Sequence, residues 1–375
     1  MSSAPPHAEA GRFVVGGPRD SSCPSSPWLP ERELVALASG FARAEAALGL
    51  REVNLARTPS FDLVGAPGAP RVRVHLALEC FQVTGSFKVR GALFALREAR
   101  RRTPGLSRVV AASAGNHGAG VAFAAKALGL TATLFVPRGA PEAKLAKMRA
   151  YGAEPRLADS IHYDGAETEA MAYAAAEGVP FVSPYDDPDV LVGNGASLAF
   201  EIARALGAPP AAVVAPIGGG GLATGLALGL AVAAGVPYGE GPPVLAAQSE
   251  ASCAFALSLE RGRAITTLEG PPTLAEGLEG GISERGFARA RAVCAGALVV
   301  SEAAIEAAMY ALYTHLGLVV EGSAAVGVAA LATQAGQAAL ARAGAGSDAD
   351  VVVVVTGRNV DAARAAKVVL RQPVR

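Results

Sequence analysis

The stretch Val83-Thr84-Gly85-Ser86-Phe87-Lys88-Val89-Arg90-Gly91 guides the interpretation of the whole chain. It places Lys88 in a turn of small residues, after an apolar segment (72–78) and before a helical pattern (92–96). A lysine in such a turn is commonly a solvated surface charge. A buried lysine instead has a lowered pKa, because burial disfavours the ammonium form, and its neutral amine condenses with carbonyl groups. The spacing alone does not separate these two roles.

Short apolar segments alternate with alanine-rich helical segments along most of the chain. Strands separated by helices pair in parallel through right-handed crossovers. The segment 351–355 is five consecutive valines, as expected of a strand buried on both faces. The pattern therefore predicts an α/β fold with parallel sheets flanked by helices. The expected strands are 72–78, 108–112, 132–136, 180–182, 211–216, 244–247 and 351–355.

The N-terminal part of the chain has a different composition. Residues 1–30 are rich in proline, serine and glycine, so we expect a disordered extension there. Apolar residues at helical spacing predict a helix over 31–48.

Composition excludes several classes of partner. The chain has 375 residues, 51% of them hydrophobic, which suits a sizeable core. Its 33 basic and 33 acidic residues balance, so the composition shows no excess positive charge that would favour binding to nucleic acid or an anionic membrane. The longest apolar run, 222–236, is interrupted by glycines and too short to span a bilayer.

The four cysteines lack metal-ligand spacing and are interpreted as free thiols, so we expect a cytoplasmic protein without a metal site.

A second segment, Ala112-Ser113-Ala114-Gly115-Asn116-His117-Gly118, follows a predicted strand and begins a helix expected at 119–128. The free N–H groups and the positive dipole end at a helix start attract a carboxylate or a phosphate. Taken alone, the segment is better explained as a helix cap with a glycine turn.

A third segment, Gly218-Gly219-Gly220-Gly221-Leu222, lies between a buried strand (211–217) and an apolar helix (222–234). Glycines let consecutive N–H groups converge on one anion, and the helix start adds its field. No Lys-Ser/Thr pair follows, which excludes a Walker loop, and the Gly-x-Gly-x-x-Gly dinucleotide pattern is missing.

Two further segments, 321–325 (Glu-Gly-Ser-Ala-Ala) and 355–360 (Val-Thr-Gly-Arg-Asn-Val), complete a resemblance. Together with 184–188 (Pro-Tyr-Asp-Asp-Pro), these segments resemble the fold-type II pyridoxal-phosphate enzymes, in the threonine/serine dehydratase branch. The likeness runs from about Thr58, in a turn similar to the family's Thr-Pro-Leu, to about Asn359.

The resemblance implies a two-lobed fold similar to that of the tryptophan synthase β subunit. It implies a large domain for pyridoxal 5'-phosphate (PLP) from 31–107 and 187–375, and a small mobile domain from 108–186. Lys88 would be the catalytic residue, which bonds to the cofactor and then acts as general base. The resemblance places the cofactor against Lys88, Phe87, Asn116, Gly218, Gly219, Gly220, Gly221, Leu222 and Thr356, and the substrate against Ser86, Ser113, Ala114, Gly115 and His117.

The implied reaction is the β-elimination of L-threonine, L-serine or a related β-hydroxy amino acid to a 2-oxo acid and ammonia. The resemblance also implies a homodimer or another homo-oligomer that takes a small amino-acid substrate. Three alternatives stay open: a serine racemase, a PLP-dependent β- or γ-replacement synthase, and a non-catalytic scaffold protein. Racemases carry a serine where this chain has Ala114.

Several residues depart from the family's pattern. Ala77 replaces a usual lysine, and Gln248 and Ala254 stand where racemase-like members have the carboxylates of a cation site. Arg358 replaces a glycine two residues after Thr356. The Arg358 guanidinium either reaches the substrate pocket and pairs with a polar β-group, or turns outward to cover apolar surface or pair with a surface carboxylate. We favour the outward position.

Overall fold

The computed structural model describes residues 11–16, 29–57, 72–140, 142–346 and 348–371. Within them lie a seven-stranded sheet in the order β1-β9-β8-β7-β10-β3-β2 and a three-stranded sheet in the order β4-β5-β6. The strands of the large sheet are β1 Gly11–Val15, β2 Leu55–Arg57, β3 Arg73–Ala77, β7 Ala212–Pro216, β8 Val244–Ser249, β9 Gly296–Val300 and β10 Asp350–Val354. Those of the small sheet are β4 Arg108–Ala112, β5 Thr131–Val136 and β6 Glu154–Leu157.

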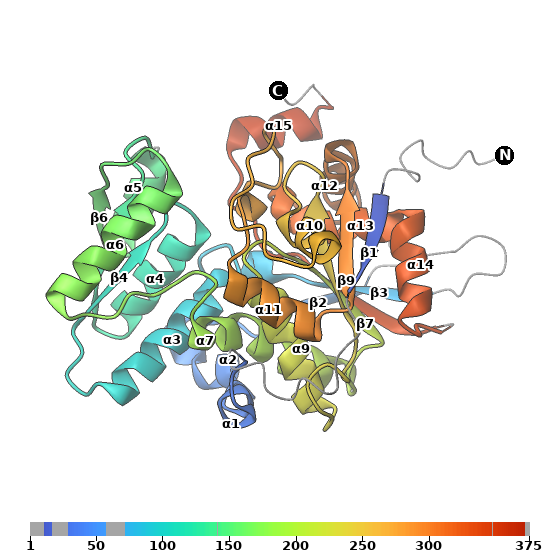
Figure 1. The fold of residues 1–375 in the computed structure, drawn as a ribbon, viewed down its shortest axis with the longest axis horizontal. Helices are drawn as coiled ribbons and strands as arrows, with labels where there is room; N and C mark the ends of the chain where they lie inside the picture. The colour runs from blue at the N-terminus through green and yellow to red at the C-terminus, as the bar shows by residue number, and fades with distance from the viewer. Residues whose placement is uncertain (1–10, 17–28, 58–71, 141, 347, 372–375) are drawn as a thin grey trace.

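The five central strands of the large sheet and all three strands of the small sheet are parallel, as the strand–helix alternation predicted. The two edge strands, β1 and β2, are antiparallel to their neighbours. In Figure 1 the small sheet and its helices form the left-hand lobe and the large sheet forms the right-hand one.

Helices cover both faces of the large sheet and also flank the small sheet. They are α1 Arg32–Ala36, α2 Phe41–Ala44, α3 Lys88–Arg102, α4 Asn116–Ala127, α5 Glu142–Ala150, α6 Tyr163–Glu177, α7 Pro188–Leu191, α8 Ser197–Leu206, α9 Gly221–Ala233, α10 Ala254–Arg261, α11 Glu284–Val293, α12 Glu302–Leu316, α13 Gly322–Ala332, α14 Gln334–Arg342 and α15 Ala362–Val369.

The valines of β10 show why this strand is continuously apolar. Val352 and Val354 pack into the core beneath α3, α8 and α9, whereas Val351, Val353 and Val355 pack into the core beneath α12 and α13. All five are fully buried. Both faces of the strand are therefore covered, as the five-valine run predicted.

Three local predictions were wrong. The expected disordered segment 1–30 contains β1, which pairs along its whole length with β9. The expected helix 31–48 is interrupted, because Gly40 has φ +75° and turns the chain between α1 and α2. The expected strand 180–182 is reduced to a single bridge between Phe181 and Val110. The family-like turn at Thr58 lies outside the described residues.

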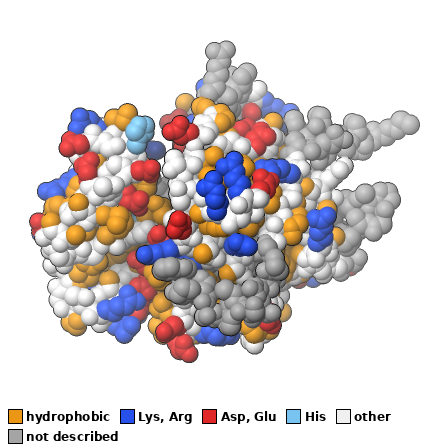
Figure 2. All heavy atoms as spheres, in the orientation of Figure 1, with side chains coloured by type: hydrophobic (Ala, Val, Ile, Leu, Met, Phe, Trp, Pro, Cys, Tyr) orange, Lys and Arg blue, Asp and Glu red, His pale blue; other side chains and the backbone are white. Residues whose placement is uncertain are grey.

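The face of the molecule drawn in Figure 2 has no dominant charge of one sign. Figure 2 shows acidic and basic side chains interspersed over the visible face. Within the described residues, no single helix is long and apolar enough to span a membrane. Only α13 and α14 taken together, with a bend of 75° between them, reach that length and composition, and α13 is buried in the core.

Candidate active site

Lys88 is the first residue of α3 and is partly buried. Its Nζ donates a hydrogen bond to the carbonyl oxygen of Pro184 at 3.0 Å and lies 5.3 Å from the centre of the Phe87 ring. Burial lowers the pKa of Lys88 to about 8, although the nearby Glu321 partly opposes this shift. Lys88 is therefore a desolvated amine rather than a surface charge.

The turn before Lys88 is fixed to the end of β10. The Phe87 N–H donates to the carbonyl oxygen of Thr356 at 3.1 Å, and Ser86 forms an isolated bridge with Gly357. Ser86 is fully buried and the Thr356 side chain is 3% exposed. The carboxyl end of a central strand thus lies beside the lysine, in the position where open α/β sheets bind ligands.

The segment from Ser113 to His117 joins β4 to α4, which begins at Asn116, three residues earlier than expected. The Ser113 hydroxyl accepts a hydrogen bond from the Gly115 N–H at 3.0 Å, which shapes the turn. Ala114 is partly buried and packs on the apolar core.

His117 is buried, and its Nε2 lies 3.0 Å from the carbonyl oxygen of Val182, so Nε2 carries the proton. Burial, with Lys88 adding to it, lowers the pKa of His117 to about 3. The ring is therefore neutral at pH 7. Its Nδ1 is buried and lacks a hydrogen-bond partner within the described part of the chain.

The glycine segment joins β7 to the N-terminus of α9. Gly220 has φ +94°, a conformation that favours glycine, and precedes the first helical residue, Gly221. A Cβ at Gly219 would lie 2.5 Å from Cγ of Tyr185, so only glycine allows this close approach. Leu222 is 6% exposed and anchors the first turn. The first N–H groups of α9 have no carbonyl partner within the helix and are available to an anion.

Two polar residues for which the sequence predicted no role, Glu321 and Lys147, also lie at this site. The Asn116 Nδ2 donates to both carboxylate oxygens of Glu321, at 3.0 and 3.1 Å, and burial raises the pKa of Glu321. The sequence marked Glu321 only as part of a matched segment, although a lone carboxylate before an apolar helix is a usable signal. Lys147 of α5 donates to the Asn359 Oδ1 at 2.7 Å. No motif indicated Lys147, since it lies in a lysine- and alanine-rich helix.

The departures noted in the sequence also have defined positions. Arg358 is exposed, and its guanidinium carbon lies 5.5 Å from the centre of the Phe81 ring. This cation–π contact supports the outward position. The Gln248 amide donates to the Ile217 carbonyl at 3.0 Å and accepts from the Ala256 N–H at 3.0 Å. The part of the chain described in the structure contains no group of three or more His, Cys, Asp or Glu residues placed to hold a metal ion.

Comparison with known proteins agrees with this geometry. The family model described as pyridoxal-phosphate dependent enzyme matches residues 52–357, so the chain belongs to that family. The L-threonine ammonia-lyase of Thermotoga maritima is 35% identical over 294 residues, which cover 77% of this chain and 67% of that protein. The serine racemase of Homo sapiens is 32% identical over 287 residues, which cover 76% of this chain and 80% of the racemase.

A solved structure extends the likeness to the fold. The processed form of threonine deaminase isoform 2 from Solanum lycopersicum has a TM-score of 0.78 and 25% identity, covering 98% of this chain and 99% of that chain. The predicted family, the α/β fold and the dependence on PLP are thereby confirmed. The boundaries of a small mobile domain at 108–186 and the roles of single site residues stay predictions.

The described residues fit PLP. Lys88 offers an amine of lowered pKa for its aldehyde, and the N-terminus of α9 offers N–H donors for its phosphate. The buried Nδ1 of His117, which has no partner among the described residues, is an acceptor that a donor from a ligand or a water can satisfy.

Proposed function

We propose that this chain dehydrates and deaminates L-threonine, L-serine or a related β-hydroxy amino acid, giving a 2-oxo acid and ammonia. The observation that carries this proposal is Lys88, a partly buried amine whose pKa is lowered to about 8, fixed beside the end of β10. The relatives named threonine ammonia-lyase and threonine deaminase support it.

The residues of the site have distinct roles in this proposal. When bound, PLP supplies an electron sink that weakens the bond between the α-carbon and its proton. Lys88 accepts that proton, and a base whose pKa is near the working pH does so efficiently. The segment from Ser113 to His117, with the N–H groups at the start of α4, holds the substrate carboxylate. Phe87, Asn116, Gly218–Gly221 and Leu222 position the cofactor.

Thr356 explains why elimination is favoured. Its side chain is a buried neutral hydroxyl. A carboxylate in this position would keep a proton on the pyridine nitrogen of PLP, whereas a hydroxyl does not. The resulting weaker electron sink suits a reaction in which the leaving group departs soon after the α-proton. Loss of the α-proton and of the β-hydroxyl as water leaves an unsaturated amine, which tautomerises and is hydrolysed to the 2-oxo acid and ammonia.

A serine racemase is the second candidate, favoured by the likeness to the human racemase. Racemisation needs a group that returns a proton to the opposite face of the α-carbon. Ala114, in the segment assigned to the substrate, has no hydroxyl for this purpose. We therefore rank elimination first. A replacement synthase is ranked lower because the Asn116-His117-Gly118 sequence resembles the dehydratase loop.

We also propose a homodimer or another homo-oligomer and a cytoplasmic location. The location is supported by Cys80 and Cys253, which are free thiols and buried. Free thiols are typical of a reducing compartment.

The test is a panel of β-hydroxy amino acids (L-threonine, L-serine and 3-hydroxyaspartate) in which ammonia, 2-oxo acid and D-amino acid are measured together. We expect equal amounts of ammonia and 2-oxo acid from at least one substrate, little D-serine, and loss of activity in Lys88→Ala by roughly a thousandfold or more. D-serine as the main product would establish the racemase instead. Ammonia without 2-oxo acid, or no turnover of any substrate, would contradict both.

A further inference from the structure

Four polar side chains form one hydrogen-bonded chain across the two lobes. Lys147 Nζ donates to Asn359 Oδ1 at 2.7 Å, Asn359 Nδ2 donates to Asn116 Oδ1 at 2.6 Å, and Asn116 Nδ2 donates to Glu321. Lys147 and Asn116 belong to the small-sheet lobe, whereas Asn359 and Glu321 belong to the large-sheet lobe. The chain therefore passes from one lobe to the other at each of its three links.

The direction of these hydrogen bonds is set at both ends. An ammonium group only donates hydrogen bonds, and an ionised carboxylate only accepts them. Asn359 must therefore present its oxygen to Lys147 and its amide nitrogen to Asn116. Asn116 in turn presents its oxygen to Asn359 and its amide nitrogen to Glu321. Neither amide can turn over without losing hydrogen bonds: Asn116 would lose those to Asn359 and Glu321, and Asn359 would lose those to Lys147, Asn116 and the Thr84 carbonyl.

Burial of the Lys147 ammonium group costs desolvation free energy, which a surface lysine would not lose. It is partly buried, and burial lowers its pKa, with Arg358 adding to this effect and Glu321 opposing it. Its Nζ also donates to the Thr84 carbonyl at 3.2 Å, four residues before Lys88. A small-lobe ammonium is thus fixed between the turn that carries Lys88 and the segment that follows Thr356.

We propose that Lys147 is a positioning residue, which acts through Asn359 to orient the Asn116 amide and to hold the small lobe against the site. This inference rests on the proposed function, in which Asn116 contacts the cofactor. Lys147 itself touches neither the cofactor nor the reacting atoms in this assignment. Its removal leaves only the Thr84 carbonyl, which accepts from Asn359 Nδ2 at 3.1 Å, to keep the Asn359 amide from reversing and presenting the wrong atom to Asn116.

The test compares Lys147→Met, which keeps the length but loses the donor, with Lys147→Arg, which keeps a donor. The control is Arg149→Met, because Arg149 lies on the same helix and pairs only with the exposed Glu142 in the described contacts. The first readout is backbone hydrogen exchange of the full-length protein at 113–118 and 356–360. We expect Lys147→Met to speed exchange about fivefold, the change for one lost net hydrogen bond.

The second readout is the absorbance spectrum of the bound cofactor as a function of pH. We expect Lys147→Met to shift its midpoint, Lys147→Arg to restore it in large part, and Arg149→Met to leave it at the wild-type value. If Lys147→Met matches Arg149→Met in both exchange and spectrum, the inference is wrong. Neither readout needs a substrate, so a wild-type protein that fails the substrate panel refutes the proposed function without deciding this one.

Discussion

Burial lowers the pKa of both Lys88 and Lys147, but the two side chains differ in their hydrogen-bond acceptors. Within the described part of the chain, Lys147 has two acceptors around its ammonium group, whereas Lys88 has one, the Pro184 carbonyl. With a pKa of about 8, roughly one Lys88 amine in ten is neutral at pH 7, against about one in three thousand for an unshifted lysine. The nucleophile is the neutral amine. Desolvation of Lys88 therefore supports the proposal that this is the residue that reacts.

This selection predicts the pH dependence of cofactor incorporation. The neutral fraction of Lys88 rises as the pH rises through about 8, so the rate at which cofactor-free protein takes up PLP should rise with a midpoint near pH 8. Rapid-mixing absorbance between pH 6.5 and 9.5 measures it, with Lys88→Ala as the control that takes up none covalently. A rate that still rises steeply at pH 9.5, as expected for the ordinary lysine pKa of 10.5, would show that Lys88 is not desolvated.

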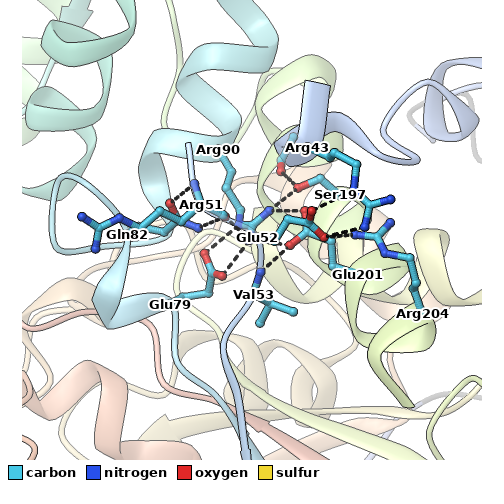
Figure 3. A network of polar contacts seen from close by, with 11 residues as sticks. Arg43, Arg51, Glu52, Val53, Glu79, Gln82, Arg90, Ser197, Glu201 and Arg204 are labelled. Atoms are coloured by element: carbon cyan, nitrogen blue, oxygen red, sulfur yellow. Dashed lines mark hydrogen bonds and ion pairs between the residues drawn. The ribbon is translucent and has the colours of Figure 1, made fainter. Parts of the chain in front are cut away.

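At the scale of elements, α3 is fixed by a buried arginine two residues after Lys88. The Arg90 guanidinium is fully buried between Glu79 and Glu201, with charged hydrogen bonds of 2.7–2.9 Å to both carboxylates (Figure 3). Glu201 also accepts a hydrogen bond from the Val53 N–H at 2.7 Å. These contacts join the first turn of α3 to α8 and to the segments before β2 and after β3.

Removing Arg90 should therefore destabilise the fold strongly. Arg90→Met leaves two buried carboxylates without their cation, and we expect the free energy of unfolding to fall by about 3–5 kcal/mol. Arg43→Met, which breaks an exposed ion pair with Glu52 in the same region, should cost less than about 1 kcal/mol. Urea unfolding followed by circular dichroism measures both. Equal, small losses would show that the buried carboxylates find other partners.

Elements whose own residues form a recognisable pattern could be predicted from the sequence. Elements that depend on pairing with residues distant in the chain could not. The valines of β10 indicate a strand buried on both faces, and the glycines from Gly218 indicate the turn that joins β7 to α9. The strand β1 has no such signal, because its stability comes from pairing with β9, nearly three hundred residues later. The motifs likewise located Asn116, whereas Lys147 reaches the site only through the packing of α5 across the lobes.

At the scale of the whole molecule, the two lobes share one apolar core. Residues of the small sheet such as Leu134 belong to the same buried cluster as Val89 of α3 and Val213 of the large sheet. Gly120 of α4 approaches α3 so closely that a Cβ there would lie 3.0 Å from the Lys88 carbonyl oxygen. Movement of the small lobe would therefore pivot at the α3–α4 contact, beside Lys88, which favours a small rotation over a wide opening.

The edges of the large sheet are formed by its two antiparallel strands, β1 and β2. β1 pairs with β9 along five residues, Arg12 forms an ion pair with Glu260, and the Arg342 guanidinium lies 5.9 Å from the Phe13 ring. Without β1, the apolar strand β9 would become an exposed edge. Such an edge is a template for pairing with other chains.

Deleting residues 1–16 should accordingly both destabilise the protein and cause it to associate. Five cross-strand pairs at about 0.2–1 kcal/mol each predict a loss of roughly 1–5 kcal/mol in the free energy of unfolding. Deletion of residues 1–10 is the matched control, since it leaves β1 in place. Thermal unfolding measures the stability of both deletion variants, and light scattering measures their association. If the two deletions have the same Tm and the same particle size, β1 does not protect this edge, and the N-terminal segment lacks the structural role assigned to it.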